Sequence, residues 1–495
     1  MEIHFEQKQV SCLKQMLRQL QTGEVTQEIR LPEEMPDVGR IIAGWGQMIL
    51  RSKEWRGDSI SCSGGIMCRM LYEPEEEGTP QVLESWLPFQ QRWNLEDGLR
   101  EGSIRLQCLC RSVDARSVSA RKIMVRCSYG ILAEATREQK VMVPVPGEVP
   151  EDVRMKIGRY PIRLPREAGE KQFLTEETLG PVSPKPEKIV ACSMDPKISD
   201  IKIHGDKLSF RGNGMVHLTA LSQEGMLYSL DLEVPFSQIA ELEQSYGPDA
   251  RGDVVMAMTS LDTELDPEGN LVLKASMAAQ YMVDERQVLE LVEDAYSTGR
   301  EMQIQWESVE LPVILEEKQI SVPVNQTLRI PAEKMADVVY WPDFPVVRRN
   351  GSLEMEIPGM FQAVWYDEAG KLRSTQARTE EKWEGPAGDG CVFSASVVPS
   401  GAAAGTPGAS ITLNAEAVIR TQCRQDTGNP AVKALELGQP LNDKGRPSMV
   451  LCRAGGKDLW EMARENLSTV EAIRQINGLE AEPEPGKMLL IPVLR

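Results

Sequence analysis

The segment MVLCRAGGKDLWEMARENLSTVEAIRQINGLEAEPEPGKMLLIPV, residues 449–493, decides the fold of the C-terminal end of the chain. It opens on a short apolar run, 449–452, and closes on another, 488–493. Runs of this length, bounded by Gly-rich and Pro-rich turns, predict strands. Between them lie two stretches in which apolar residues recur at helical spacing. We therefore expect a small strand–helix–helix–strand unit over 447–495.

Capping signals predict where the two helices of this unit begin and end. Asp458 and Glu461 have the spacing of a capping box, which predicts a helix start. Ser468 and Glu471 repeat that spacing and predict the second start. Gly478 follows the second apolar stripe and supplies a residue that adopts positive φ just past a helix.

The whole arrangement resembles the LysM family, most closely in TVEAI, NGL and PGKMLLIPV. The resemblance implies a shallow groove for N-acetylglucosamine polymers, formed by the turn before the first helix and the turn after the second. Where the family commonly has Pro-Gly-Asp-Thr, this chain has GGKD, residues 455–458. Charges of both signs, from Lys457 and Glu480, favour a protein contact over a sugar contact. The candidate partner- or glycan-binding residues are Gly456, Lys457, Asp458, Trp460, Asn477, Gly478, Leu479 and Glu480.

Most of the remaining chain repeats itself at an offset of 148 residues. Gly57-Asp58 corresponds to Gly205-Asp206, and the Pro-Phe pair at 88–89 corresponds to that at 235–236, where the offset is 147. A weaker third copy begins at 335–338, MADV, which resembles MPDV at 35–38. We expect repeats over 1–150, 151–300 and 301–440.

Each repeat alternates polar and apolar residues between Gly-rich and Asp-rich turns, which predicts short strands. The expected fold is mainly β, with tandem β-sandwich or barrel-like repeats before the C-terminal unit. Helices are expected only at 12–21, 236–246 and 284–297. Linkers are expected at 140–175 and 424–447, and a long hairpin loop at 399–409.

The repeats and the C-terminal unit together resemble the LysM-containing spore-coat morphogenetic proteins of endospore-forming Firmicutes, which carry SPOCS domains. Residues 36–38, the 57–89 run with its second copy, and 434–438 carry this resemblance. It implies a non-enzymatic structural adaptor of sporulation that docks the coat's basement ATPase, or another coat protein, through the LysM module. It also implies a place at the forespore surface, in the mother-cell cytoplasm. The alternative is a peptidoglycan or N-acetylglucosamine-polymer binding protein.

Composition limits the classes of partner. The 495-residue chain has a formal net charge of −19, which argues against nucleic acid and anionic membrane surfaces. The charged start, MEIHFE, predicts no signal peptide, and the lack of any run of about 18 apolar residues predicts no membrane insertion.

Ten cysteines without a CxxC pair, and only three histidines, predict free thiols in a reducing compartment and no structural zinc. Motifs for phosphate loops, zinc hydrolases and serine hydrolases are missing. We expect no catalytic, cofactor or metal site. An enzyme built on two carboxylates stays as a further alternative, because 74 acidic residues do not reveal such a pair.

Overall fold

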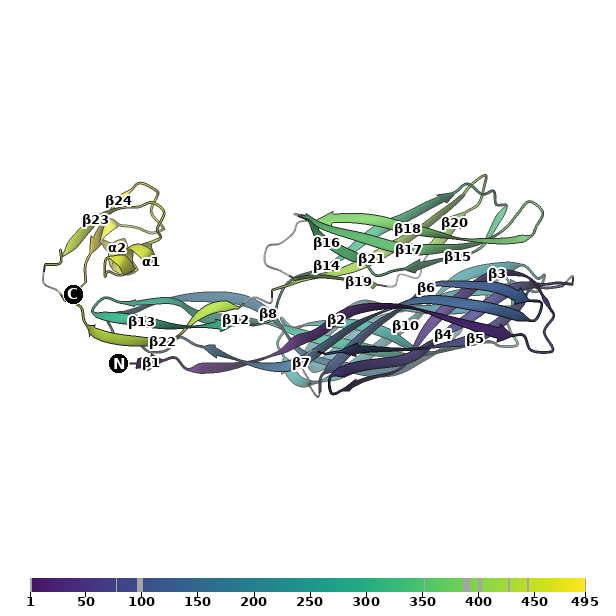
Figure 1. Cartoon of the computed structure of the whole chain (residues 1–495), viewed down its shortest axis with the longest axis horizontal. Helices are drawn as coiled ribbons and strands as arrows, with labels where there is room; N and C mark the ends of the chain where they lie inside the picture. The colour runs from purple at the N-terminus through teal and green to yellow at the C-terminus, as the bar shows by residue number, and fades with distance from the viewer. Residues whose placement is uncertain are drawn as a thin grey trace.

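The structure is a computed structural model that describes residues 2–76, 78–95, 101–350, 352–385, 392–398, 403–425, 428–442 and 445–494. Over these residues strands dominate, and two short helices lie near the C-terminus (Figure 1). The predicted mainly β class is confirmed. Neither helix in these ranges has the length and apolar character that crossing a membrane requires.

The first unit consists of two sheets that face each other. Its strands are β2 (Gln7–Arg30), β3 (Val38–Arg56), β4 (Ser59–Pro74), β5 (Gln81–Asn94), β6 (Ser103–Ser119) and β7 (Lys122–Pro144). One sheet has the order β2-β7-β6 and the other β3-β4-β5. Alternate residues of β4, among them Ile60, Ile66 and Met70, are fully buried in the core between the sheets, as the period of two requires.

The second unit repeats these strand positions. It consists of β8 (Val153–Leu179), β9 (Pro186–Ser222), β10 (Leu227–Tyr246), β11 (Arg251–Leu265) and β12 (Leu271–Ser297). β9 covers the positions of both β3 and β4, and its middle residue Gly205 has φ +61, as Gly57 between β3 and β4 has φ +59. The Ser199 hydroxyl donates to the Arg211 carbonyl at 3.1 Å, so the segments on either side of Gly205 lie next to each other.

The third unit has the same arrangement with shorter strands. Its strands are β14 (Val313–Leu328), β15 (Lys334–Pro342), β16 (Val346–Asn350), β17 (Ser352–Tyr366), β18 (Leu372–Gly385), β19 (Val392–Val398), β20 (Ala403–Thr406) and β21 (Ile411–Gln425). β15 and β16 both pair with β17, whereas β3 pairs with β4 along one continuous strand. In the expected hairpin loop at 399–409, residues 399–402 lie outside the described residues, and 403–406 form β20, which pairs with β21.

A further sheet joins segments that are far apart in the sequence. β1 (Glu2–His4), β22 (Asn429–Pro440) and β13 (Arg300–Val309) pair in the order β1-β22-β13. This sheet packs against the first half of β8 and the second half of β12, with Leu435 and Val292 fully buried between them (Figure 1). We call this assembly the base lobe. The predicted linkers at 140–175 and 424–447 are therefore wrong over β8 and β22, which pair with distant strands.

The three helices expected before the C-terminal unit are also wrong. Residues 12–21 lie in β2, 236–246 in β10 and 284–297 in β12. Their apolar spacing suits a helix, but 12–21 and 284–297 pair with a neighbouring strand over nearly all of their length, and 236–246 pairs over its first half. Tertiary pairing thus overrides local preference.

The three units share buried surfaces and a buried polar cluster. Asp337 on β15 accepts hydrogen bonds from Trp45 Nε1 of β3 at 2.8 Å and lies 2.6 Å from His217 Nε2 of β9. His217 Nδ1 lies 2.7 Å from Asp231 of β10. Burial lowers the pKa of His217, but the Asp337 charge and the hydrogen bonds with both carboxylates outweigh it and raise the pKa to about 10. His217 is therefore charged at neutral pH and links the units.

His217→Gln should lower stability in a pH-dependent manner. The folded pKa lies above the ordinary value of 6.5, so the contribution of His217 is complete below pH 6.5 and disappears as the pH rises through about 10. Removing one partner of such a buried pair costs about 3–5 kcal/mol. Thermal unfolding from pH 6 to 10.5 measures the difference. The matched control is His4→Gln, at an exposed histidine. A deficit that stays constant across this pH range would contradict the assignment.

Candidate functional site

The C-terminal end of the chain has the order β23 (Met449–Arg453), α1 (Leu459–Glu465), α2 (Val470–Asn477) and β24 (Met488–Pro492). β23 and β24 pair antiparallel. Leu459, Ile473 and Leu489, one residue from each of α1, α2 and β24, are buried together. We call residues 449–492 the C-terminal module.

Side-chain caps fix both helices. The Asp458 carboxylate accepts from the Glu461 N–H at 2.8 Å, and Glu461 accepts from the Asp458 N–H at 3.3 Å, which completes the predicted capping box. The second predicted box is wrong by one residue. Thr469, not Ser468, is the N-cap of α2 and accepts from the Ala472 N–H at 3.1 Å, because α2 begins at Val470.

The turns that carry the candidate residues lie next to each other. Glu482, in the loop after α2, accepts from the Leu459 N–H at 3.2 Å at the start of α1. Gly456 and Gly478 both have positive φ, 80° and 60°, and Gly478 forms the predicted C-cap. Leu479 is half-buried against the module core, and Glu480 is exposed.

Two of the candidate polar residues make contacts within the module. Lys457 Nζ pairs with Glu465 at 2.6 Å on the surface. The Asn477 amide bonds both backbone groups of Leu490, donating to the carbonyl at 2.6 Å and accepting from the N–H at 2.8 Å. Asn477 thereby fastens the end of α2 to β24.

Trp460 and Asp458 contact the base lobe. The Trp460 ring packs edge-on against Tyr296 of β12 with centroids 4.8 Å apart, and its Nε1 donates to Asp294 at 2.8 Å. Asp458 lies 3.5 Å from Lys156 of β8. The Tyr296 hydroxyl donates to the Ser468 carbonyl at 2.8 Å, and burial raises the pKa of Tyr296 to about 12. These contacts position the module on the base lobe.

Sequence patterns did not indicate these contacts between the module and the base lobe. Asp294 and Tyr296 fall in a segment predicted as a helix. The residues around them show no sequence pattern that indicates a contact with residues more than 150 positions further along the chain. Tyr296 can contact Trp460 only after β12 has paired with β8, so this contact depends on long-range strand pairing.

An apolar face of the module points to solvent. Met449 and Leu451 of β23 are 42% and 60% exposed, and Met488 and Leu490 of β24 are 51% and 40% exposed. Leu451 and Leu490 are directly opposite each other in the register, so the four side chains share one face of the sheet. Ile476 of α2, beside the Asn477 contact, is 41% exposed. We call the four strand residues the apolar face.

The apolar face has a signature in the sequence of the closing strand. The closing strand is apolar at consecutive positions, and Leu489 and Ile491 alone fill its core-facing side. Strands that read as continuous apolar runs are typical of sheets covered on both sides. In this chain the second side of β24 is only partly covered by the described residues, with Met488 51% and Leu490 40% exposed.

No protein-family model, curated protein or solved structure matches this chain.

Trp460→Ala should loosen the attachment of the module to the base lobe, leaving the Tyr296–Ser468 hydrogen bond and the Asp458–Lys156 pair. The change removes the ring contact with Tyr296 and the hydrogen bond to Asp294, together worth about 1–3 kcal/mol. Small-angle X-ray scattering of the full chain should show an increased radius of gyration. Lys457→Ala, which removes only a surface pair within the module, should leave it unchanged. Equal dimensions for wild type and Trp460→Ala would show that these contacts do not hold the module.

Ile473→Ala should unfold the module while the β units remain intact. Ile473 is fully buried, so a cavity costs about 2–5 kcal/mol in a domain with little stability to spare. Hydrogen exchange over α1 and α2 measures the loss of protection. Ile476→Ala is the matched control, because that side chain lies on the same helix and is 41% exposed. Equal protection in both variants would contradict the described core.

Proposed function

We propose that this chain is a non-enzymatic structural adaptor of spore-envelope assembly that docks a coat morphogenetic protein through its C-terminal module. The place of action is the forespore surface, facing the mother-cell cytoplasm. The resemblance of the sequence to SPOCS-domain and LysM-containing coat proteins supports the biological setting. The solvent-facing apolar face is the observation that carries the docking role.

The apolar face has the properties of a protein-docking surface. Contiguous exposed apolar side chains on a small domain are costly in water and typically mark interaction sites. Arg453 is exposed in the same sheet, opposite Met488 in the register. We infer a partner surface with apolar side chains at its centre and a carboxylate facing Arg453. The coat's basement ATPase, which the resemblance implies as partner, is the occupant we propose.

The β units supply the scaffold in this proposal. The base lobe holds the module through Trp460 and Tyr296, which are not part of the apolar face. The module is thereby fixed on one side and free to bind on the other. Such an arrangement suits an adaptor, because ordering the docking element before binding reduces the entropy lost in the complex.

Peptidoglycan binding is the alternative. It would use the turns around α1 and α2, where hydrogen-bonding side chains and an aromatic ring could meet a sugar. Trp460 and Asn477 are the residues best suited to that role, and both are engaged inside the chain. Because these two side chains are already engaged, docking of a protein partner is better supported than binding of a glycan.

Leu451→Asp should weaken binding to the purified coat basement ATPase by about 10- to 100-fold, the range for a central hot-spot residue. The reason is that a carboxylate on the apolar face must lose its hydration on docking. Leu174→Asp is the matched control, since Leu174 of β8 is 59% exposed against 60% for Leu451. Biolayer interferometry with the full chain measures both.

Unchanged affinity of Leu451→Asp would place the docking surface elsewhere. Retention of the full chain on insoluble peptidoglycan, lost on Trp460→Ala and kept on Leu451→Asp, would support the glycan alternative instead.

A further inference from the structure

The three β units enclose a small cavity where they meet. Its volume is about 60 Å³, and its walls come from β2, β6 and β7 of the first unit, β8, β11 and β12 of the second, and β14, β19 and β21 of the third. The cavity is independent of the C-terminal module. Its size matches a few waters or one small ion.

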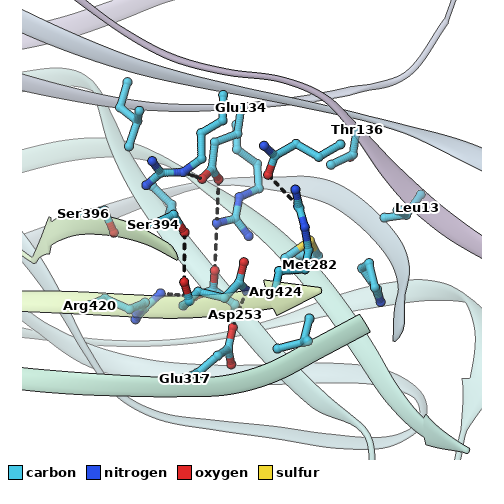
Figure 2. A pocket seen from close by; sticks show the side chains of 18 of the residues that line it. Leu13, Glu134, Thr136, Asp253, Met282, Glu317, Ser394, Ser396, Arg420 and Arg424 are labelled. Carbon is cyan, nitrogen blue, oxygen red and sulfur yellow. Dashed lines mark hydrogen bonds and ion pairs between the residues drawn. The ribbon is translucent and has the colours of Figure 1, made fainter. Parts of the chain in front are cut away.

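A chain of alternating charges crosses this cavity. Glu134 accepts from Arg18 Nε at 2.8 Å and lies 3.2 Å from Arg105 Nη2. Arg105 Nη2 also lies 2.7 Å from Asp253, and Asp253 in turn pairs with Arg420 Nη1. Figure 2 shows Glu134 and Asp253 on opposite sides of the cavity, with dashed contacts running between them. We call these five residues the charge ladder.

The charge ladder ends on a cation at both ends. Three arginines alternate with two carboxylates, which leaves one positive charge in excess. The complete described lining shows the same excess, with four arginines against three carboxylates. This is the reverse of the chain as a whole, whose net charge is −19. Uncompensated charge is expensive away from water, so an excess at such a site calls for a counter-charge.

Arg105 has buried N–H donors without an acceptor. It is 8% exposed, and its Nε and Nη1 have no hydrogen-bond partner among the described residues. Buried donors without acceptors are rare and costly in native proteins. The neighbouring Arg420 is close to Arg105 and largely buried. Burial, and to a smaller extent the positive charge of Arg105, lowers the pKa of Arg420 to about 10. Both guanidinium groups would be stabilised by one additional acceptor with negative charge.

We propose that this cavity binds a small oxyanion, which bridges Arg105 and Arg420 and thereby links the three units. An oxyanion fits better than a halide, because the planar fork of a guanidinium matches the paired oxygens of phosphates and carboxylates. The bound anion would supply the acceptors that Arg105 lacks and cancel the excess positive charge. Binding would stabilise the junction by mass action, since only the folded chain holds these arginines together.

Isothermal titration calorimetry of the full chain with inorganic phosphate tests the proposal, with sodium chloride at equal ionic strength as reference. We expect saturable binding at one site, and binding about tenfold weaker in Arg420→Gln, the loss typical of one charged hydrogen bond. Arg159→Gln is the matched control, because the Arg159 side chain is 75% exposed in a surface pair. Sulfate and acetate in place of phosphate identify the class of oxyanion.

A cavity-filling variant keeps the test decisive should Arg420→Gln fail to fold. Ser396 lines the cavity and carries no charge of the ladder, so Ser396→Leu should abolish binding by occupying the space. Binding of none of the three oxyanions by wild type would overturn the proposal. So would unchanged binding in a folded Ser396→Leu or Arg420→Gln variant.

Discussion

The contact between Arg105 and Asp253 is the interaction on which the rest of the structure depends. The two residues are 148 residues apart, the offset of the internal repeat, and so occupy the same position in the first and second units. One copy carries the cation and the other the anion, and Arg420 of the third unit completes the contact. Buried charges tolerate few arrangements, because any shift leaves one of them without a partner. The His217 cluster imposes a second constraint of this kind between the same three units. Together they select one orientation of the units.

The fixed orientation of the three units determines where the C-terminal module lies. The base lobe forms from the start, the middle and the end of the β region, since β1, β13 and β22 must meet beside the ends of β8 and β12. The module then docks on the base lobe through Trp460 and Tyr296. Its apolar face, which includes Leu451 and Leu490, stays in solvent. In the proposed adaptor role, the β units therefore serve to hold one small docking surface at a defined place.

Sequence patterns predicted the local features well. Gly57 and Gly205 marked equivalent turns, and Asp458 and Gly478 marked helix ends, because backbone conformation at these positions depends on the residue itself. The base lobe and the 284–297 strand were missed, since pairing partners more than a hundred residues away decide them. Among the candidate site residues, Lys457, Asp458, Trp460 and Asn477 have contacts inside the chain. The continuous apolar run of β24 indicates its exposed apolar side, whereas the attachment of the module through Trp460 depends on where the base lobe lies.

Scanning calorimetry of the Asp253→Asn variant beside the wild type tests most directly whether the charge ladder unites the three β units. The substitution keeps the shape of the side chain but leaves Arg105 and Arg420 facing each other without the carboxylate between them. We expect the β units of the wild type to unfold in one transition, and Asp253→Asn to separate it into at least two transitions at lower temperature. Separate transitions in the wild type, or a single unshifted transition in Asp253→Asn, would contradict this expectation.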